Sequence, residues 1–154
     1  MKKINLIALL SLILLSSCAP TDHSESNLID LEGFFNGKEN RYGVYYFSEN
    51  CPNCVNTKPY INKYLDKIAA KPQQNFYLEN IYFVDALVTP IHRYQGGLNK
   101  ETYKTVTIGV DNINTLTTMG YPELFIVEKV NNKNVVVDVK VGEKETTDFI
   151  KSIW

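Results

Sequence analysis

Residues 42–54 read YGVYYFSENCPNC, and this stretch decides the fold. Its first part, 42–47, is almost continuously apolar and aromatic, which predicts a strand buried on both faces. After a short polar turn, a stripe of apolar residues predicts a helix from about Cys51 to Ala70, closed by Lys71 and Pro72. The sequence therefore predicts a strand that runs directly into a helix whose first turn carries two cysteines.

A cysteine pair at a helix start suits thiol–disulfide exchange. The unpaired N–H groups and partial positive charge of a helix N-terminus favour a thiolate at Cys51. The two intervening residues, Pro52 and Asn53, return Cys54 to within disulfide range after one turn. Pro52 fits an early helix position because its missing N–H costs nothing there. We therefore expect Cys51 to be the exposed nucleophile and Cys54 to be the buried resolving thiol.

Two structural alternatives exist for this pair. A static disulfide between Cys51 and Cys54 is one, although a two-residue loop gains little loop-closure stability. Half of a metal site is the other. A closed zinc site needs four ligands, and only His23 and His92 are available as further histidines.

The rest of the chain predicts an α/β domain. Strands are expected over 80–87, 123–130 and 135–141, the last with alternating valines. Shorter helices are expected over 28–35, near 98–104 and over 112–119, and a C-terminal helix has an apolar face of Phe149, Ile150, Ile153 and Trp154. The order predicts a parallel strand pair with a crossover helix, then a hairpin and a covering helix.

This order, with CxxC at the first strand-to-helix junction, resembles the thioredoxin fold. The resemblance spans about 43–154 and also rests on Pro59, Gly142 and the sequence Gly120-Tyr121-Pro122 before a strand. It implies a central mixed four-stranded sheet flanked by helices. It also implies that Pro122 is cis and that Tyr121 and Pro122 shape a substrate platform against the cysteines. An ordinary turn proline is the alternative.

The sequence departs from the thioredoxin pattern in several places. Asn50 stands where thioredoxins have tryptophan, and Tyr45 stands where they have a buried aspartate. Glu49 could partly replace that acid. Only 28–35 is available for a first strand and helix, and 88–111 is an insertion before the proline loop, where Dsb-type oxidants carry a larger helical piece.

The Pro52-Asn53 dipeptide resembles glutaredoxin and Dsb-type sites more than thioredoxin. The resemblance implies an intermediate reduction potential. The chain also resembles small Gram-positive thioredoxin-like accessory proteins linked to bacteriocin secretion.

The N-terminus has the pattern of an export signal. Two lysines precede a dozen largely apolar residues, 4–15, which match a secretory signal and are too few to span a bilayer. The following Leu15-Ser16-Ser17-Cys18 resembles the bacterial lipobox. That resemblance implies a signal peptide over 1–17, acylation of Cys18 and membrane anchoring. A free Cys18 after a simple signal peptide is the alternative. We expect residues 18–27 to be the lipidated cysteine and a polar tether.

The composition limits the remaining classes. A chain of 154 residues with 44% apolar residues predicts one domain, here placed at 28–154. Removing 1–17 takes away two lysines and no acid, so the formal net charge falls from −1 to −3. This charge argues against nucleic acid as a partner, because phosphate binding needs a basic surface.

These observations predict a membrane-anchored, extracytoplasmic thiol–disulfide oxidoreductase acting on cysteines of exported proteins. Cys51 and Cys54 would carry the reaction without a cofactor, in a monomer reset by a membrane redox partner. The alternative is a non-enzymatic scaffold lipoprotein of a secretion or conjugation apparatus. The insertion at 88–111 and the missing aspartate motivate that alternative.

Overall fold

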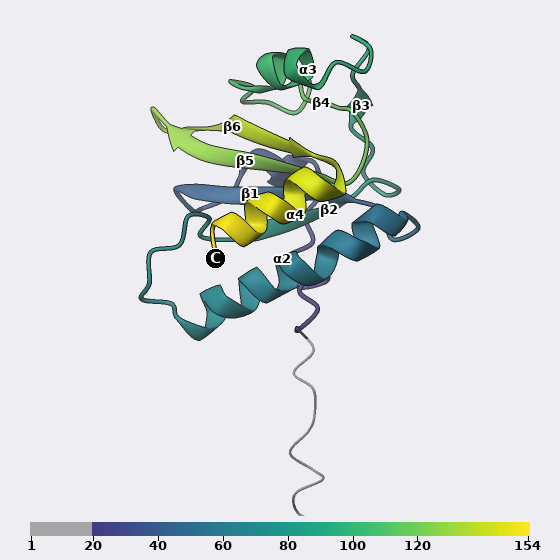
Figure 1. The fold of residues 1–154 in the computed structure, drawn as a ribbon. Helices are drawn as coiled ribbons and strands as arrows, with labels where there is room; N and C mark the ends of the chain where they lie inside the picture. The colour runs from purple at the N-terminus through teal and green to yellow at the C-terminus, as the bar shows by residue number, and fades with distance from the viewer. Residues whose placement is uncertain (1–19) are drawn as a thin grey trace, which may run out of the picture.

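The computed structural model describes residues 20–154 as a sheet with helical segments on both faces (Figure 1). The elements in chain order are η1 (Glu32–Phe35), β1 (Arg41–Phe47), α2 (Pro52–Ala70), β2 (Ile81–Asp85), β3 (His92–Arg93), α3 (Lys100–Thr107), β4 (Thr117–Thr118), β5 (Glu123–Val130), β6 (Lys133–Val141) and α4 (Gly142–Ser152). The expected signal peptide over 1–17 and the lipidated Cys18 lie outside the described residues. Among the residues that are described, no helix is both long and apolar enough to cross a membrane.

The main sheet has four strands in the order β2-β1-β5-β6. Strands β1 and β2 are parallel and are joined by α2, whereas β5 is antiparallel to both β1 and β6. The register places Tyr45 opposite Leu124 and Tyr46 opposite Glu123. This mixed α/β arrangement confirms the expected fold class of a four-stranded mixed sheet with flanking helices.

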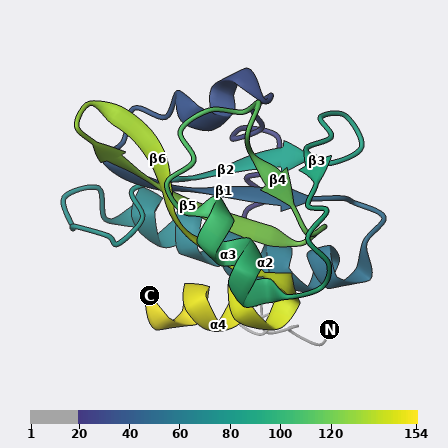
Figure 2. The same ribbon diagram turned by 90° about the horizontal axis from the view of Figure 1, so that it is seen from above.

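Each face of the sheet has its own core. On one face, Tyr45 and Leu124 pack with residues of α2 and α4 such as Ile61 and Ile150. On the other face, the neighbouring strand residues pack with η1 and α3, where Phe34 and Tyr103 are fully buried. The side chains of a strand alternate between faces, so each strand contributes to both cores. Figure 2, which looks down on the sheet, shows η1 and α4 at opposite sides of it.

Most elements follow the sequence expectations, with three corrections. The helix expected over 28–35 is reduced to η1, because Leu28 pairs with Phe83 instead. Residues 112–119, expected to be helical, instead form turns that end in β4, because Thr117 and Thr118 pair with β3. Val55, expected on the buried stripe of α2, is 57% exposed, and Cys54 and Thr57 face the core in its place. The helix is therefore rotated relative to the stripe that hydrophobicity alone predicts.

The segment before η1 is attached to the domain. The side chain of His23 contacts Asp66 on α2 at 2.8 Å, and Asp22 pairs with Lys58 at 3.0 Å. Further along, Leu28 forms a single parallel bridge with Phe83 of β2. The first strand and helix of the thioredoxin resemblance are thus reduced to this bridge and the short helix η1. From Pro20 onward, the residues expected to be a tether lie against the domain.

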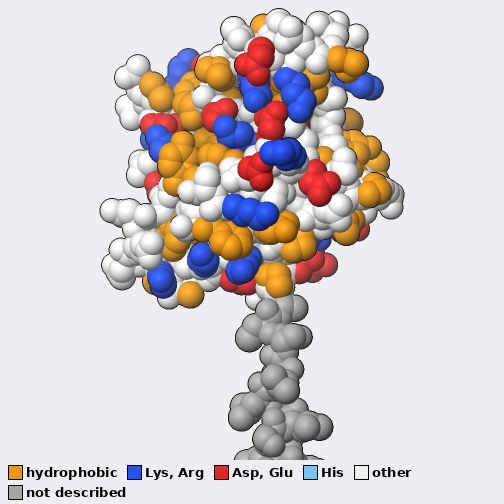
Figure 3. All heavy atoms as spheres, in the orientation of Figure 1, with side chains coloured by type: hydrophobic (Ala, Val, Ile, Leu, Met, Phe, Trp, Pro, Cys, Tyr) orange, Lys and Arg blue, Asp and Glu red, His pale blue; other side chains and the backbone are white. Residues whose placement is uncertain are grey.

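The insertion forms a small layer above the sheet. Strands β3 and β4 pair in parallel, and α3 follows β3 (Figure 1). Glu145 of α4 joins α3 to the C-terminal helix, because it pairs with Lys104 at 2.8 Å and with Lys100 at 3.2 Å. Figure 3 shows positive and negative side chains intermixed over this side of the molecule.

Candidate active site

Helix α2 begins at the first cysteine. Cys51 is the N-cap residue with an extended backbone, and Pro52 follows at the start of the helix. The Sγ of Cys51 accepts a hydrogen bond from the N–H of Cys54 at 3.3 Å. This bond satisfies one of the N–H groups that a helix start leaves unpaired. The local fold therefore holds the Cys51 sulfur beside the backbone of Cys54, with Pro52 and Asn53 exposed between them.

The two thiols have different surroundings. Cys51 is partly exposed, whereas Cys54 is only 2% exposed, and both are free. Burial, reinforced by the hydrogen bond with Cys51, raises the pKa of Cys54 to about 12. Cys54 is therefore a thiol at neutral pH. An accessible sulfur next to a buried one is the order of exposure that the sequence predicts for nucleophile and resolving thiol.

Tyr45 fills the place of the missing aspartate. Its side chain is fully buried, and its hydroxyl donates to the carbonyl oxygen of Cys54 at 3.2 Å. Burial raises the pKa of Tyr45 above its ordinary value, so the phenol stays neutral. Its ring stacks with that of Phe47 at 5.7 Å. Tyr45 thus holds the first turn of α2 through the hydrogen bond to Cys54. It does not supply a group that ionises near neutral pH.

The loop before β5 approaches the cysteines from the other side. The Tyr121–Pro122 peptide bond is cis, and the carbonyl oxygen of Tyr121 lies 3.8 Å from the Cys51 Sγ. The N–H of Gly142 donates to the carbonyl oxygen of Pro122 at 2.8 Å. Gly142 has φ +87°, which glycine adopts without a steric penalty. Three motifs that are far apart in the sequence therefore meet at one end of the sheet.

Two hollows flank this meeting point. One, of about 440 Å³, is lined by Cys54 and by residues on both sides of it, including Glu49 and Pro20. The other, of about 390 Å³, is lined by Tyr121 and the loop residues before it, together with Arg93 of β3. Tyr121 is 45% exposed. The site therefore has one hollow beside Cys54 and another beside Tyr121, whose carbonyl oxygen contacts Cys51.

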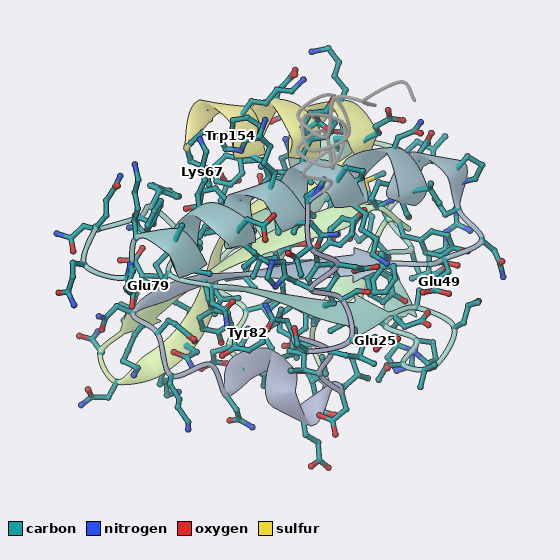
Figure 4. All side chains as sticks on the ribbon, turned by 90° about the horizontal axis from the view of Figure 1, so that it is seen from below. Glu25, Glu49, Lys67, Glu79, Tyr82 and Trp154 are labelled. Atoms are coloured by element: carbon teal, nitrogen blue, oxygen red, sulfur yellow. The ribbon has the colours of Figure 1, made fainter. Side chains whose placement is uncertain are left out.

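Glu49 lies at the N-terminal end of α2, as Figure 4 shows. It is exposed, and within residues 20–154 no hydrogen bond joins it to either cysteine. The expectation that it partly replaces the missing acid gains no support from these contacts. The same view places Trp154 beside Lys67, whose Nζ lies 4.5 Å from the indole ring, so the end of the chain packs on α2.

The two histidines considered as zinc ligands lie on separate elements. His23 is bonded to Asp66, and His92 is exposed on β3. Within the described part of the chain, no group of three or more His, Cys, Asp or Glu side chains is arranged to hold a metal ion.

A buried acidic residue beside the proline loop was not predicted from the sequence. Glu123 follows Pro122 directly and is fully buried. Burial raises the pKa of its carboxyl group to about 7, although hydrogen bonds from Thr118, Met119 and Tyr103 oppose the shift. The signal was present in the sequence as one acidic residue at the head of the apolar run ELFIV.

No protein-family model matches the chain, and no curated protein matches it in sequence. Among solved structures, it is similar to mitochondrial thioredoxin 3 from Saccharomyces cerevisiae, with 15% identity and a TM-score of 0.49 over 86% of this chain and 97% of that one. It is also similar to a Plasmodium falciparum thioredoxin, with 15% identity and a TM-score of 0.45 over 81% and 83%. A chloroplastic thioredoxin z gives 12% identity and a TM-score of 0.44 over 82% and 92%.

The architecture itself rests on the strand order, the strand directions and the parallel crossover through α2. With CxxC at the start of that crossover helix and a cis proline facing it, the chain has a thioredoxin-like fold.

Proposed function

We propose that the protein is a thiol–disulfide oxidoreductase that acts on cysteines of exported proteins. One observation carries the proposal: the partly exposed Cys51 sulfur lies 3.3 Å from the backbone nitrogen of Cys54, whose thiol is buried, and 3.8 Å from the carbonyl oxygen of Tyr121. Exchange needs an accessible attacking sulfur with a second thiol close enough to resolve the mixed disulfide. The first turn of α2 brings both thiols together, so the exchange needs no further reactive side chain.

The reaction in the reducing direction uses both cysteines in turn. The Cys51 sulfur attacks one sulfur of a substrate disulfide, which forms a mixed disulfide and releases the other substrate sulfur as a thiolate that takes up a proton. Cys54 then loses its proton and attacks Cys51, which forms the Cys51–Cys54 disulfide and frees the second substrate thiol. Two electrons pass from the pair to the substrate. A redox partner at the membrane reverses this change, and oxidation of substrates runs the same steps backwards.

The high pKa of Cys54 slows the second step. Cys54 attacks only as a thiolate, so the mixed disulfide between Cys51 and substrate persists until Cys54 is deprotonated. Tyr121 lines the second hollow, and its carbonyl oxygen lies 3.8 Å from the Cys51 Sγ, so we expect Tyr121 and Pro122 to offer backbone to an extended substrate peptide.

The proposed cellular setting is supported by the sequence of the N-terminus. Acylation of Cys18 after removal of 1–17 would hold the domain at the outer side of the bacterial cell membrane. Replacing Cys18 by Ser should abolish incorporation of labelled palmitate and release the protein from the membrane fraction. Its thiol activity in solution should remain.

The catalytic test uses two matched variants. Cys51→Ser should lose insulin reduction and disulfide formation. Cys54→Ser should instead accumulate a mixed disulfide with substrate that survives on non-reducing gels, because the resolving thiol is absent. A Cys51→Ser protein with full activity would falsify the proposal. A scaffold function, favoured by the inserted layer and by the neutral Tyr45, predicts that Cys51→Ala/Cys54→Ala restores full function in cells.

A further inference from the structure

The carboxyl group of Glu123 ties three segments together under the proline loop. One carboxyl oxygen, Oε1, accepts the N–H of Met119 at 2.8 Å. The other, Oε2, accepts from the hydroxyl of Thr118 at 2.8 Å and from that of Tyr103 at 3.0 Å. Glu123 is fully buried, so these groups replace water around the carboxyl. Because Tyr103 belongs to α3, the cluster also links the insertion to the loop.

Both hydroxyls have a second acceptor. The Tyr103 hydroxyl lies 3.0 Å from the carbonyl oxygen of Thr117, and the Thr118 hydroxyl lies 2.8 Å from that of Gly120. A hydroxyl has one proton and donates to one acceptor at a time. When Glu123 is ionised, both hydroxyls point to Oε2. When Oε2 carries a proton, it donates to one hydroxyl, which then turns its own proton to its backbone carbonyl.

The cluster therefore has two arrangements, and in each of them the carboxyl group and both hydroxyls keep a hydrogen-bond partner. Neither arrangement leaves one of these buried side chains unpaired, which would be costly. The two arrangements differ in which backbone carbonyl oxygens of the loop accept a hydrogen bond from the hydroxyls. One of these oxygens belongs to Gly120, the residue that precedes Tyr121.

The cluster is separated from the cysteines by the sheet and the proline loop. Glu123 shares its face of β5 with Phe125, whereas Leu124 packs with Cys54 on the α2 face. Its connection to Cys51 runs along the chain, since Tyr121 is two residues earlier and its carbonyl oxygen lies 3.8 Å from the Cys51 sulfur.

We propose that Glu123 is a positioning residue for thiol exchange, which sets the conformation of the 118–121 loop beside Cys51 according to its own protonation. The role rests on the proposed oxidoreductase function. It makes substrate exchange respond to pH through a group that touches neither cysteine. The proposed role also involves the insertion, because Tyr103 of α3 supplies one of the two hydroxyls that change their hydrogen-bond acceptor.

The surroundings support a carboxyl that changes state near neutrality. Burial raises its pKa to about 7. The elements around it carry six titratable or charged groups. These are Tyr103 of α3, Tyr46 of β1, Tyr121 of the loop, Arg93 of β3, and Lys100 and Glu145, which hydrogen-bond to the backbone of its β6 partner Val141. Both Tyr46 and Tyr103 have raised pKa values and stay neutral, so they do not titrate with Glu123.

The test compares Glu123→Gln with Glu128→Gln. Glutamine reproduces the neutral arrangement, since its oxygen accepts from Met119 and its NH₂ donates to the two hydroxyls. Glu128 is a matched control, because it lies on the same strand and pairs with Arg41 at 2.6 Å, away from the cysteines. Rates of reduction of a disulfide-containing peptide are measured from pH 5 to 9, together with the amide NMR shifts of Met119 and Tyr121.

Wild-type protein and Glu128→Gln should show an inflection in kcat/KM near pH 7 that matches the amide titration. Glu123→Gln should remain active and lose both. Glu123→Ala should raise KM for the peptide at least threefold at every pH. An active Glu123→Gln protein with the wild-type pH profile overturns the positioning role alone. Failure of the wild-type protein to exchange thiols overturns the proposed function and this role with it, whether or not the amides titrate.

Discussion

The carbonyl oxygen of Tyr121 lies 3.8 Å from the sulfur of Cys51, although 70 residues separate them in the sequence. This contact joins the crossover helix of the first half of the chain to the hairpin of the second half. Each partner of the contact is close to a hollow, since Cys54 of the same helical turn lines one, and Tyr121 lines the other together with Arg93.

The two thiols should differ sharply in reactivity. Cys51 is accessible, whereas Cys54 is 2% exposed and its pKa is raised to about 12. Iodoacetamide at pH 8 should therefore alkylate Cys51 about tenfold faster or more, as measured by peptide mass spectrometry. Equal rates in the folded protein, with Cys18 replaced by Ser to remove the third thiol, would contradict the arrangement of the site.

Tyr45→Phe should weaken the first turn of α2. The change removes the hydroxyl that bonds to the Cys54 carbonyl and should lower the free energy of unfolding by about 1 kcal/mol in urea titrations. It should also speed alkylation of Cys54. Tyr42→Phe is the control, because the Tyr42 hydroxyl bonds to Phe34 at 3.0 Å, away from the site. A change in Cys54 reactivity of the same size in both variants would argue against a local role for Tyr45.

Glu123 should impose a pH dependence on stability. Its carboxyl pKa rises from 4.5 to about 7 on folding, so between these values the native state holds a proton that the unfolded state has lost. Stability should therefore fall as pH rises through this window, by roughly 3 kcal/mol from this group alone. Glu123→Gln should show a flatter profile in urea unfolding between pH 4.5 and 8. Parallel profiles for the two proteins would count against a buried, neutralised carboxyl.

The N-terminal segment should depend on its contacts with α2. Asp66 accepts from both the ring of His23 and the N–H of Thr21, and the bond from His23 lowers the pKa of its carboxyl. Asp66→Asn should loosen residues 20–27 and increase their cleavage by a protease several-fold. The free energy of unfolding should change by less than about 1 kcal/mol, because the pair is partly exposed. Lys133→Ala, which removes an exposed pair with Asp111 elsewhere, should leave cleavage unchanged.

Local patterns were enough to predict most of the elements. The continuous apolar run at 42–47 and the apolar run at 123–130 became central strands β1 and β5, since a buried strand needs no alternation. The helix predicted over 112–119 was wrong. The helical periodicity there is weak, and the pairing of Thr117 and Thr118 with β3, which depends on tertiary contacts, prevails over it. Val55 was misplaced because the orientation of α2 is fixed by Cys54, Thr57 and Tyr64 rather than by its most apolar residues.

The site could be predicted only in part. The cysteine pair and the proline were visible because each belongs to a compact motif. The roles of Tyr45 and Glu123 were not visible, because they depend on what the opposite face of the sheet and the insertion bring to them. A single acidic residue in an apolar strand indicates a buried carboxyl group. Its hydrogen-bond partners Tyr103 and Thr118 can be identified only once the fold is known.

The attachment of the N-terminal segment to α2 has a consequence for how the protein would meet its substrates. With Cys18 as the lipid anchor, Ala19 is the one residue between it and Pro20, and the two steps of chain from Cys18 to Pro20 span at most about 7 Å. Pro20 lines the same hollow as Cys54. The cysteine pair would then lie close to the lipid headgroups. The protein would diffuse along the membrane surface and meet exported substrate chains there, while they are still leaving the bilayer.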